Sequence, residues 1–180
     1  MKRLFWVLAA TAVLVCAQEK QPPANTNVEL TVYLISGSTQ GTADEVPSDL
    51  EPTMKQLHSV FAYKSYKLSE SFMLRGRLRA GASAQGMIPG NAGLRYEFRY
   101  AFVEASTDVP PVFRISGLKI ILTKSGSYRR DNDGKSIPDV LASISTDLDI
   151  REGQKTVVGK SSVTATGDAL ILVIVPKLVQ

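Results

Sequence analysis

The sequence has little of the residues on which most enzymes and metal sites depend. It contains one cysteine, Cys16, and one histidine, His58, in 180 residues. A single cysteine excludes an intrachain disulfide and a metal site built from several thiolates. Any Ser-His-Asp arrangement would have to use His58, and no Gly-x-Ser-x-Gly motif is available to present a serine. We therefore expect a protein that is not an enzyme and that carries no cofactor.

The acidic residues do not form a recognisable site either. Residues 131–134 (DNDG) resemble the start of a calcium loop, but the glycine stands at position 4 and position 12 lacks a glutamate. This pattern favours a hairpin turn with Asp133 and Gly134 at its tip. Asp147 and Asp149 share one face of an alternating segment, which is typical of the solvated side of a strand. We predict no metal site and no catalytic carboxylate pair.

The first 17 residues have the pattern of a secretory signal peptide. Lys2 and Arg3 precede an apolar run from Leu4 to Val15, and Ala17 ends the segment before a predicted cut. The run is shorter than the roughly 20 residues that a membrane-spanning helix needs. A periplasmic or secreted protein is expected. The alternative is cleavage before Cys16 and attachment of a lipid there, which would anchor the protein in the envelope.

Removal of the leader changes the charge and leaves one domain. Loss of the two basic leader residues lowers the formal net charge from +4 to +2. This value is too small to indicate nucleic-acid binding. Residues 18–27 are polar with paired prolines, which predicts a disordered tether. Residues 28–180 are long enough for a single β-rich domain.

Hydrophobic periodicity in this domain favours strands. Alternating apolar residues predict strands at 28–36, 66–79, 94–102, 113–122 and 144–150, while the continuous apolar run 169–175 predicts a central strand buried on both faces and ending at Pro176. Gly117 is expected to mark a bulge or a bend. The Gly- and Ala-rich segment 81–93 reads as a loop. The fold class is α+β, with a mostly antiparallel sheet and one packed helix.

The single confident helix is expected to begin near Ser48 and to end near Phe61. Ser48 and Glu51 have the spacing of a capping box, and Pro52 is tolerated in a first helical turn. Leu50, Met54, Leu57 and Phe61 recur at helical spacing. This spacing predicts one apolar face packed against the sheet.

Arginines form the most conspicuous polar pattern. They alternate along two predicted strands, at Arg75, Arg77 and Arg79 and again at Arg95 and Arg99. If these strands pair, the five guanidinium groups share one surface, which would bind an envelope protein or an acidic envelope polymer through bidentate contacts. Aromatic residues fall on the opposite face, which argues against binding of single-stranded nucleic acid.

A second hypothesis places a small-ligand or glycan site beside the segment 81–93. Tyr96 and Tyr100 would line a cleft there. This hypothesis depends on the exposure of both rings.

Two C-terminal stretches resemble the secretin family of bacterial outer-membrane channel proteins. Residues 149–159 (DIREGQKTVVG) resemble its strand, Glu-Gly-Gln turn and short strand, and residues 170–179 (LILVIVPKLV) resemble its last strand. Lys160 stands where secretins usually carry a second glycine, and about ten residues replace their long lip segment. The resemblance implies an exported envelope protein with a secretin-like strand layout, which functions through protein or envelope contacts. Because the chain is short, the resemblance does not imply that it forms a channel.

Overall fold

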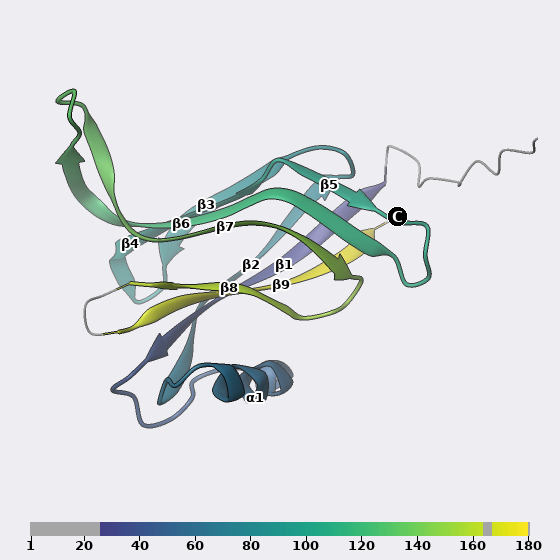
Figure 1. The fold of residues 1–180 in the computed structure, drawn as a ribbon, viewed down its shortest axis with the longest axis horizontal. Coiled ribbons are helices and arrows are strands. Elements are labelled where there is room, and N and C mark those ends of the chain that lie inside the picture. Colours follow the sequence, from purple (N-terminus) through teal and green to yellow (C-terminus); the bar gives the residue numbers. More distant parts are fainter. Residues whose placement is uncertain (1–25, 164–166, 180) are drawn as a thin grey trace, which may run out of the picture.

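The computed structural model describes residues 26–163 and 167–179, and these ranges form nine strands and one α-helix (Figure 1). The strands are β1 (Asn27–Ser38), β2 (Ser65–Arg77), β3 (Ala82–Ile88), β4 (Asn91–Tyr100), β5 (Phe102–Ala105), β6 (Val112–Arg130), β7 (Ser136–Arg151), β8 (Thr156–Ser162) and β9 (Ala169–Val179). The helix α1 (Glu51–Val60) follows a short 3-10 turn, η1 (Ser48–Leu50). This confirms the predicted β-rich α+β class. The predicted signal peptide, Cys16 and nearly all of the predicted tether lie outside the described residues.

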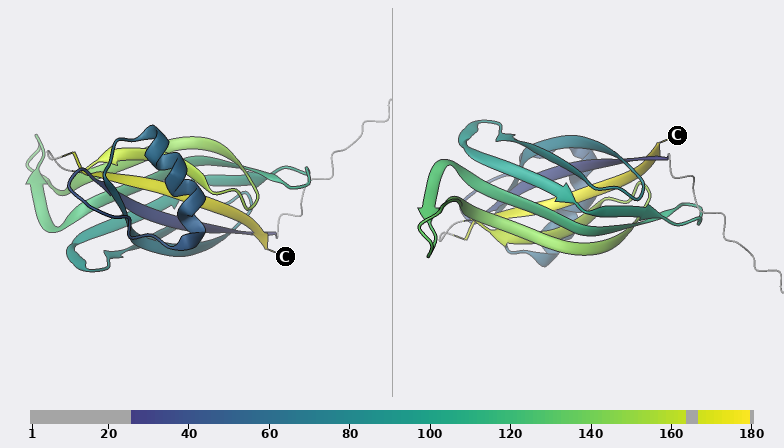
Figure 2. Two further views of the ribbon diagram at one scale, coloured as in Figure 1. Left: turned by 90° about the horizontal axis from the view of Figure 1, so that it is seen from below. Right: turned by 90° about the horizontal axis from the view of Figure 1, so that it is seen from above.

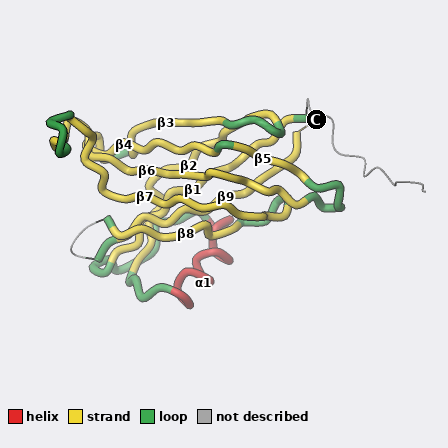
Figure 3. Tube along the Cα trace, turned by 45° about the horizontal axis from the view of Figure 1, so that its top comes forward, coloured by secondary structure: helices red, strands yellow, loops and turns green. Residues whose placement is uncertain are grey.

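The strands form two antiparallel sheets that stack face to face. Sheet A has the order β2-β1-β9-β8. Sheet B has the order β3-β4-β6-β5, and β7 also pairs with β6. The helix lies against the outer side of sheet A, so the molecule has three layers (Figures 2 and 3). In the described ranges, no helix is long and apolar enough to cross a membrane.

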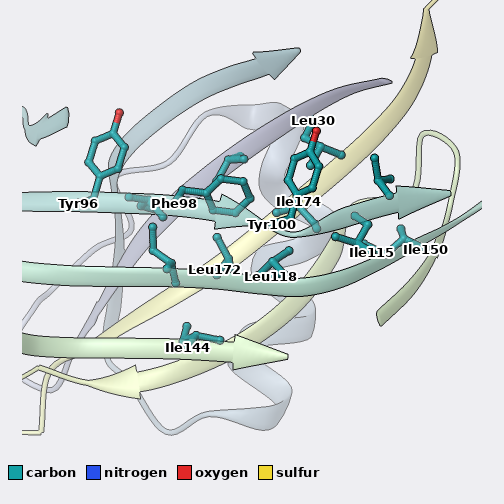
Figure 4. Packing of buried hydrophobic residues seen from close by; sticks show 14 of the residues in the cluster. Leu30, Tyr96, Phe98, Tyr100, Ile115, Leu118, Ile144, Ile150, Leu172 and Ile174 are labelled. Carbon is teal, nitrogen blue, oxygen red and sulfur yellow. The ribbon is translucent and has the colours of Figure 1, made fainter. Parts of the chain in front are cut away.

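The main core lies between the sheets. The predicted inward face of β1 is confirmed, because its alternate residues are fully buried: Val28, Leu30, Val32 and Leu34. Sheet B contributes alternate residues of β4, among which Phe98 is fully buried (Figure 4). The rings of Phe72 and Tyr96 stack across the sheets with centroids 4.9 Å apart. Burial of apolar surface on this scale is the main source of folding free energy.

Strand β9 is buried on both faces, as the continuous apolar run predicted. Leu170, Leu172 and Ile174 face sheet B, whereas Ile171 and Val173 contact the helix-side cluster. The prediction that Pro176 ends the strand is wrong, because β9 continues to Val179. The carbonyl oxygen of Pro176 accepts the Gly153 N–H at 2.9 Å. In an antiparallel strand, the N–H and C=O groups of one residue point to the same side. The N–H that Pro176 lacks would therefore point away from β1, and the pairing with β1 stays intact.

The helix has the predicted apolar face but a different start. Leu50, Met54 and Leu57 are buried against sheet A. The predicted capping box is not formed: Ser48 begins the 3-10 turn, and Leu50 occupies the N-cap position of α1 without a side-chain cap. Leu50 N–H bonds to the Pro47 carbonyl at 3.0 Å, which tightens this turn and moves Glu51 to the first helical position.

A bulge in β2 places its alternating apolar residues on two faces of the strand, whereas the sequence predicts one face. Leu34 pairs with Glu70 and Ile35 pairs with Leu68, so Ser69 has no partner in the ladder. The extra residue reverses the side on which alternate residues lie. Tyr66 and Leu68 therefore face the helix, whereas Phe72 and Leu74 face sheet B.

The Gly- and Ala-rich segment 81–93 is not a loop, contrary to the prediction. Residues 82–88 form β3, which pairs with β4 through a hairpin. Their small side chains have weak strand propensity, but they fit under the aromatic rings of β4. A Cβ atom built on Gly86 would lie 2.6 Å from the Tyr96 hydroxyl. The partner strand therefore requires small residues here.

A bend between β4 and β5 accounts for a further difference. The sequence places Phe102 on the inward face with Tyr100, but Phe102 is 36% exposed and Val103 is buried instead. Gly117 has the positive φ of 63° expected at the predicted bulge, and Ala101 donates its N–H to the Ser116 carbonyl at 3.0 Å. The bulge reverses the alternation after residue 101.

Candidate protein-binding surfaces

The five arginines do not lie on one sheet: four lie on two different sheets, and Arg79 lies in the turn between β2 and β3. Arg75 and Arg77 belong to β2, which pairs with β1 in sheet A. Arg95 and Arg99 belong to β4, which pairs with β3 and β6 in sheet B. The turn after Arg77 carries the chain from one sheet to the other, so the strand pairing that would unite the arginines is absent from the described ranges. The single five-arginine surface is therefore not formed.

On sheet A, the arginine surface is partly neutralised. Arg75 contacts the Glu29 carboxylate at 2.7 Å, and only 13% of the Glu29 side chain is exposed. Lys177 on β9 lies opposite Glu29 on its other side. Arg79 lies outside β2, in the turn before β3, with a positive φ of 63°.

On sheet B, the arginines lie on a face that no described helix covers (Figure 2). Glu97 stands between Arg95 and Arg99, and all three side chains are exposed. Arg99 lies opposite Lys119 in the β4–β6 ladder. Arg95, Arg99 and Lys119 form the basic group that the fold does bring together. Contact of this group with an acidic envelope polymer stays a prediction.

The outer edge of β3 differs chemically from the arginine surfaces. In the described part of the chain, β3 pairs with β4 alone, so its other edge carries backbone groups without a strand partner. No charged residue occurs from Ala80 to Leu94. Natural sheet edges usually carry charges, prolines or bulges that prevent pairing with another chain. Here Pro89 follows the strand, and the irregularity in the β3–β4 ladder lies at the end of β3, between Met87 and Ile88.

Three other strand edges, those of β2, β7 and β8, are covered in part by the chain itself. The start of β2 is bridged by Glu45, whose N–H bonds to the Tyr66 carbonyl at 2.7 Å and whose carbonyl accepts the Leu68 N–H at 3.0 Å. The β7 and β8 edges lie beside each other, and Ser143 N–H bonds to the Ser161 hydroxyl at 3.2 Å. The outer edge of β3 is therefore more open to pairing with a new strand than these edges are.

His58 holds the segment that covers β2. Its Nε2 atom lies 2.7 Å from the Asp44 carboxylate, and its ring meets the Tyr66 ring edge-on at 4.7 Å. The other oxygen of Asp44 accepts the Tyr66 N–H at 2.8 Å. This arrangement connects the end of α1 to the edge of sheet A.

The acidic residues singled out in the sequence have structural partners. Asp147 accepts the Gly117 N–H at 2.5 Å, and Asp149 contacts Arg114 at 3.3 Å. Asp131 accepts the N–H groups of Asp133 and Lys135, which closes the predicted hairpin turn. No group of three or more potential ligand residues suited to a metal ion occurs within residues 26–163 and 167–179.

The structure buries the two tyrosines on which the glycan hypothesis depends. Tyr96 is 6% exposed and Tyr100 is 3% exposed, and both lie between the sheets. Burial raises the pKa of both phenols above the ordinary value of 10.0. The Tyr100 hydroxyl has no hydrogen-bond partner in the described structure. Tyr96 contributes to the lining of a cavity of about 170 Å³ beside Gln85 and Arg95, but Tyr100 does not. A cleft lined by both rings is therefore not formed, and the hypothesis loses the exposure on which it depends.

The two stretches that resemble secretins lie side by side. Gly153 has a positive φ of 72° in the turn before β8. Glu152 reaches the last strand, where its carboxylate accepts the Leu178 N–H at 2.7 Å. With the bond from Gly153 to Pro176, the Glu-Gly-Gln turn closes the end of β9.

Comparison with solved structures finds two secretins. One is InvG of the Salmonella SPI-1 type III secretion injectisome (residues 176 to the end, open gate state), with a TM-score of 0.44, 11% identity and coverage of 88% of this chain and 62% of that chain. The other is the type II secretion secretin XcpQ from Pseudomonas aeruginosa, with a TM-score of 0.39, 11% identity and coverage of 87% and 60%. The chain thus spans about three fifths of the length of each. No family model and no curated protein matches the sequence.

Proposed function

We propose that the chain is an exported protein of the bacterial cell envelope that acts without catalysis, by binding a second envelope protein. The observation that carries this proposal is the uncharged outer edge of β3. An extended segment of the partner would add to this edge and form main-chain hydrogen bonds with it. Strand addition needs an edge without a strand partner and without charges that the pairing would bury. The outer edge of β3 meets both conditions.

Other features support the same function. The N-terminal pattern of a signal peptide favours export, and the Glu-Gly-Gln and C-terminal stretches resemble segments of an envelope protein family. His58, Asp147 and Asp149 hold neighbouring parts of the fold, which favours structural roles for them.

Site-specific photo-cross-linking in the producing cell tests the β3 edge. A photoreactive residue at Gln85, which is exposed on β3, should form a covalent adduct with one envelope protein. The same residue at Ser145, exposed on β7 of the same sheet, should not form that adduct. Mass spectrometry of the adduct identifies the partner.

A charge on the edge gives the matched control. Ser83→Glu adds a carboxylate to β3 opposite Arg99, where it forms a favourable cross-strand pair and should leave the hairpin stable. Ser145→Glu adds a carboxylate opposite Lys119 on β7. We expect the first substitution to abolish the Gln85 adduct and the second to preserve it. Equal adduct yields in both variants would refute strand addition at β3.

The form of attachment to the envelope has a separate test. The mass of the protein purified from envelope fractions distinguishes a chain that begins at Gln18 from one with a lipidated Cys16. The first result supports a free periplasmic or secreted protein, whereas the second supports a lipid anchor.

A further inference from the structure

Residues of β5 and of the loop before β6 line a cavity of about 410 Å³. These elements lie at one end of the sandwich (Figure 1). This volume falls within the range of roughly 300–1,000 Å³ that is usual for small-ligand sites. Its lining combines the turn after β2 and the loop before β6 with residues of three strands of sheet B, β5, β6 and β7, and includes no residue of β3. The lining includes Leu78, Arg79, Glu104, Asp108, Arg114 and Asp149.

One wall is a row of alternating charge across three strands. Glu104 on β5 lies opposite Arg114 on β6, and Arg114 lies opposite Asp149 on β7. Arg114 Nε is 3.3 Å from the Asp149 carboxylate. Both side chains of this pair are more than half exposed, so solvent and ligand can reach them.

The rest of the lining carries a third acid, Asp108, and a second base, Arg79. Asp108 is fixed by the Ser106 hydroxyl, which donates to its carboxylate at 2.9 Å. Arg79 enters the lining from the turn, and its backbone N–H bonds to the Val103 carbonyl at 2.7 Å. Arg79 has a positive φ of 63°, a conformation that glycine adopts without steric cost. Leu78 and Val112 add apolar side chains to the lining.

The charged side chains of the lining indicate the charges that a ligand of this cavity should carry. Three carboxylates and two guanidinium groups line the cavity, so a purely anionic or purely cationic ligand would meet charges of its own sign. A ligand with one ammonium and one carboxylate group can satisfy both kinds of charge through charge-assisted hydrogen bonds. We propose that this cavity binds a small zwitterion of the size of a free amino acid or a dipeptide, with its carboxylate on the arginines and its ammonium on Glu104 and Asp108.

Three probes of similar size test the proposal by NMR titration of the exported chain. The zwitterion L-alanyl-L-alanine should bind and shift the amide signals of Leu78 and Val112. N-acetyl-L-alanine lacks the ammonium group and L-alaninamide lacks the carboxylate, so each should bind at least about tenfold more weakly. No shift at these amides with millimolar dipeptide, or equal affinity for all three probes, would overturn the proposal.

Substitutions then test the basic and the acidic residues of the lining separately. Arg79→Gln and Glu104→Gln should each weaken dipeptide binding about tenfold. Arg77→Gln and Glu97→Gln remove exposed charges outside the cavity and should leave the affinity unchanged. Arg79→Gly suits the backbone conformation, so it should preserve thermal stability and still lose binding. Unchanged affinity in Arg79→Gly would refute a role for the guanidinium group. The β3 variant Ser83→Glu should bind the dipeptide normally, which separates this site from the proposed protein contact.

Discussion

Sheets A and B share one buried face but differ on the other. The outer face of sheet A packs against α1 through a second apolar cluster that includes Ile35, Leu57, Tyr66, Ile171 and Val173. The outer face of sheet B carries charged residues and lies open (Figure 2). The helix therefore buries part of the outer face of sheet A, including that of β9, whereas it leaves the outer face of sheet B uncovered.

This difference explains why the two sheets have different sequence patterns. A strand segment buried on both faces has apolar residues at every position, as in residues 169–175 of β9. A strand with one solvent-exposed face alternates, as in β4. The difference also indicates where evolution or design can alter the surface at low cost in stability. We expect substitutions on sheet B to separate sharply by face, and substitutions on β9 to be costly on both.

The largest expected effect is a loss of the β4 core residue. Phe98→Ala should lower the free energy of unfolding by about 3–5 kcal/mol, because Phe98 is fully buried between the sheets. The neighbouring exposed substitution Glu97→Ala should change it by less than about 0.5 kcal/mol. Urea denaturation of the purified protein measures both values. A comparable loss in the two variants would show that the outer face of sheet B is covered in solution.

Strand β9 should respond without this asymmetry. Leu172 and Ile171 are adjacent and fully buried on opposite faces. Leu172→Ala and Ile171→Ala should each cost about 2–5 kcal/mol in the same denaturation experiment. Tolerance of Ile171→Ala alone would mean that the helix does not remain packed on sheet A.

The predictable parts of the fold were those in which local pattern and burial coincide. Alternation in β1 and β4 and the continuous run in β9 identified their buried residues, because each strand face meets one continuous environment. Strand β3 escaped prediction because its alternate positions hold Ala82, Ala84 and Gly86. Only the neighbouring ring of Tyr96 explains why these residues are small.

The candidate surfaces were less predictable for a related reason. The alternation of arginines correctly placed Arg95 and Arg99 on an exposed face. It could not indicate that the turn after Arg77 changes sheets, since strand pairing depends on contacts between distant segments. The sequence gives no sign of the bulge at Ser69 either. In the fold, the Ser69 and Ser36 hydroxyl oxygens lie 2.5 Å apart.

The bend in sheet B should be sensitive to a single methyl group. A Cβ atom on Gly117 would lie 2.8 Å from the Ala101 Cβ, and the φ of 63° adds backbone strain. We expect Gly117→Ala to cost about 2–3 kcal/mol. Gly126 has a similar φ of 72° but no atom within 4 Å of an added Cβ, so Gly126→Ala should cost only about 1–2 kcal/mol. Equal thermal destabilisation of both variants would show that Ala101 yields to the added group.

The smallest expected effects come from two buried tyrosines that belong to different cores. Tyr66 lies in the helix-side cluster and donates its hydroxyl to the Phe61 carbonyl at 3.2 Å. Tyr66→Phe should therefore cost about 0.5–1.5 kcal/mol. Tyr100 lies between the sheets with an unpartnered hydroxyl, so Tyr100→Phe should raise the free energy of unfolding by about 1 kcal/mol.

Alkaline pH provides an independent readout of the same pair. Burial raises the pKa of both phenols above 10.0, while the unfolded chain keeps an ordinary value near 10.0. Above that pH the unfolded state loses phenolic protons that the native state retains. The stabilisation is complete below the unfolded pKa and is lost as the pH rises through the folded pKa. The free energy of unfolding should thus fall less steeply above pH 10 in Tyr100→Phe than in the natural chain. An unchanged slope, together with a destabilised Tyr100→Phe variant, would indicate that the Tyr100 hydroxyl is hydrated and that the core between the sheets is open to water.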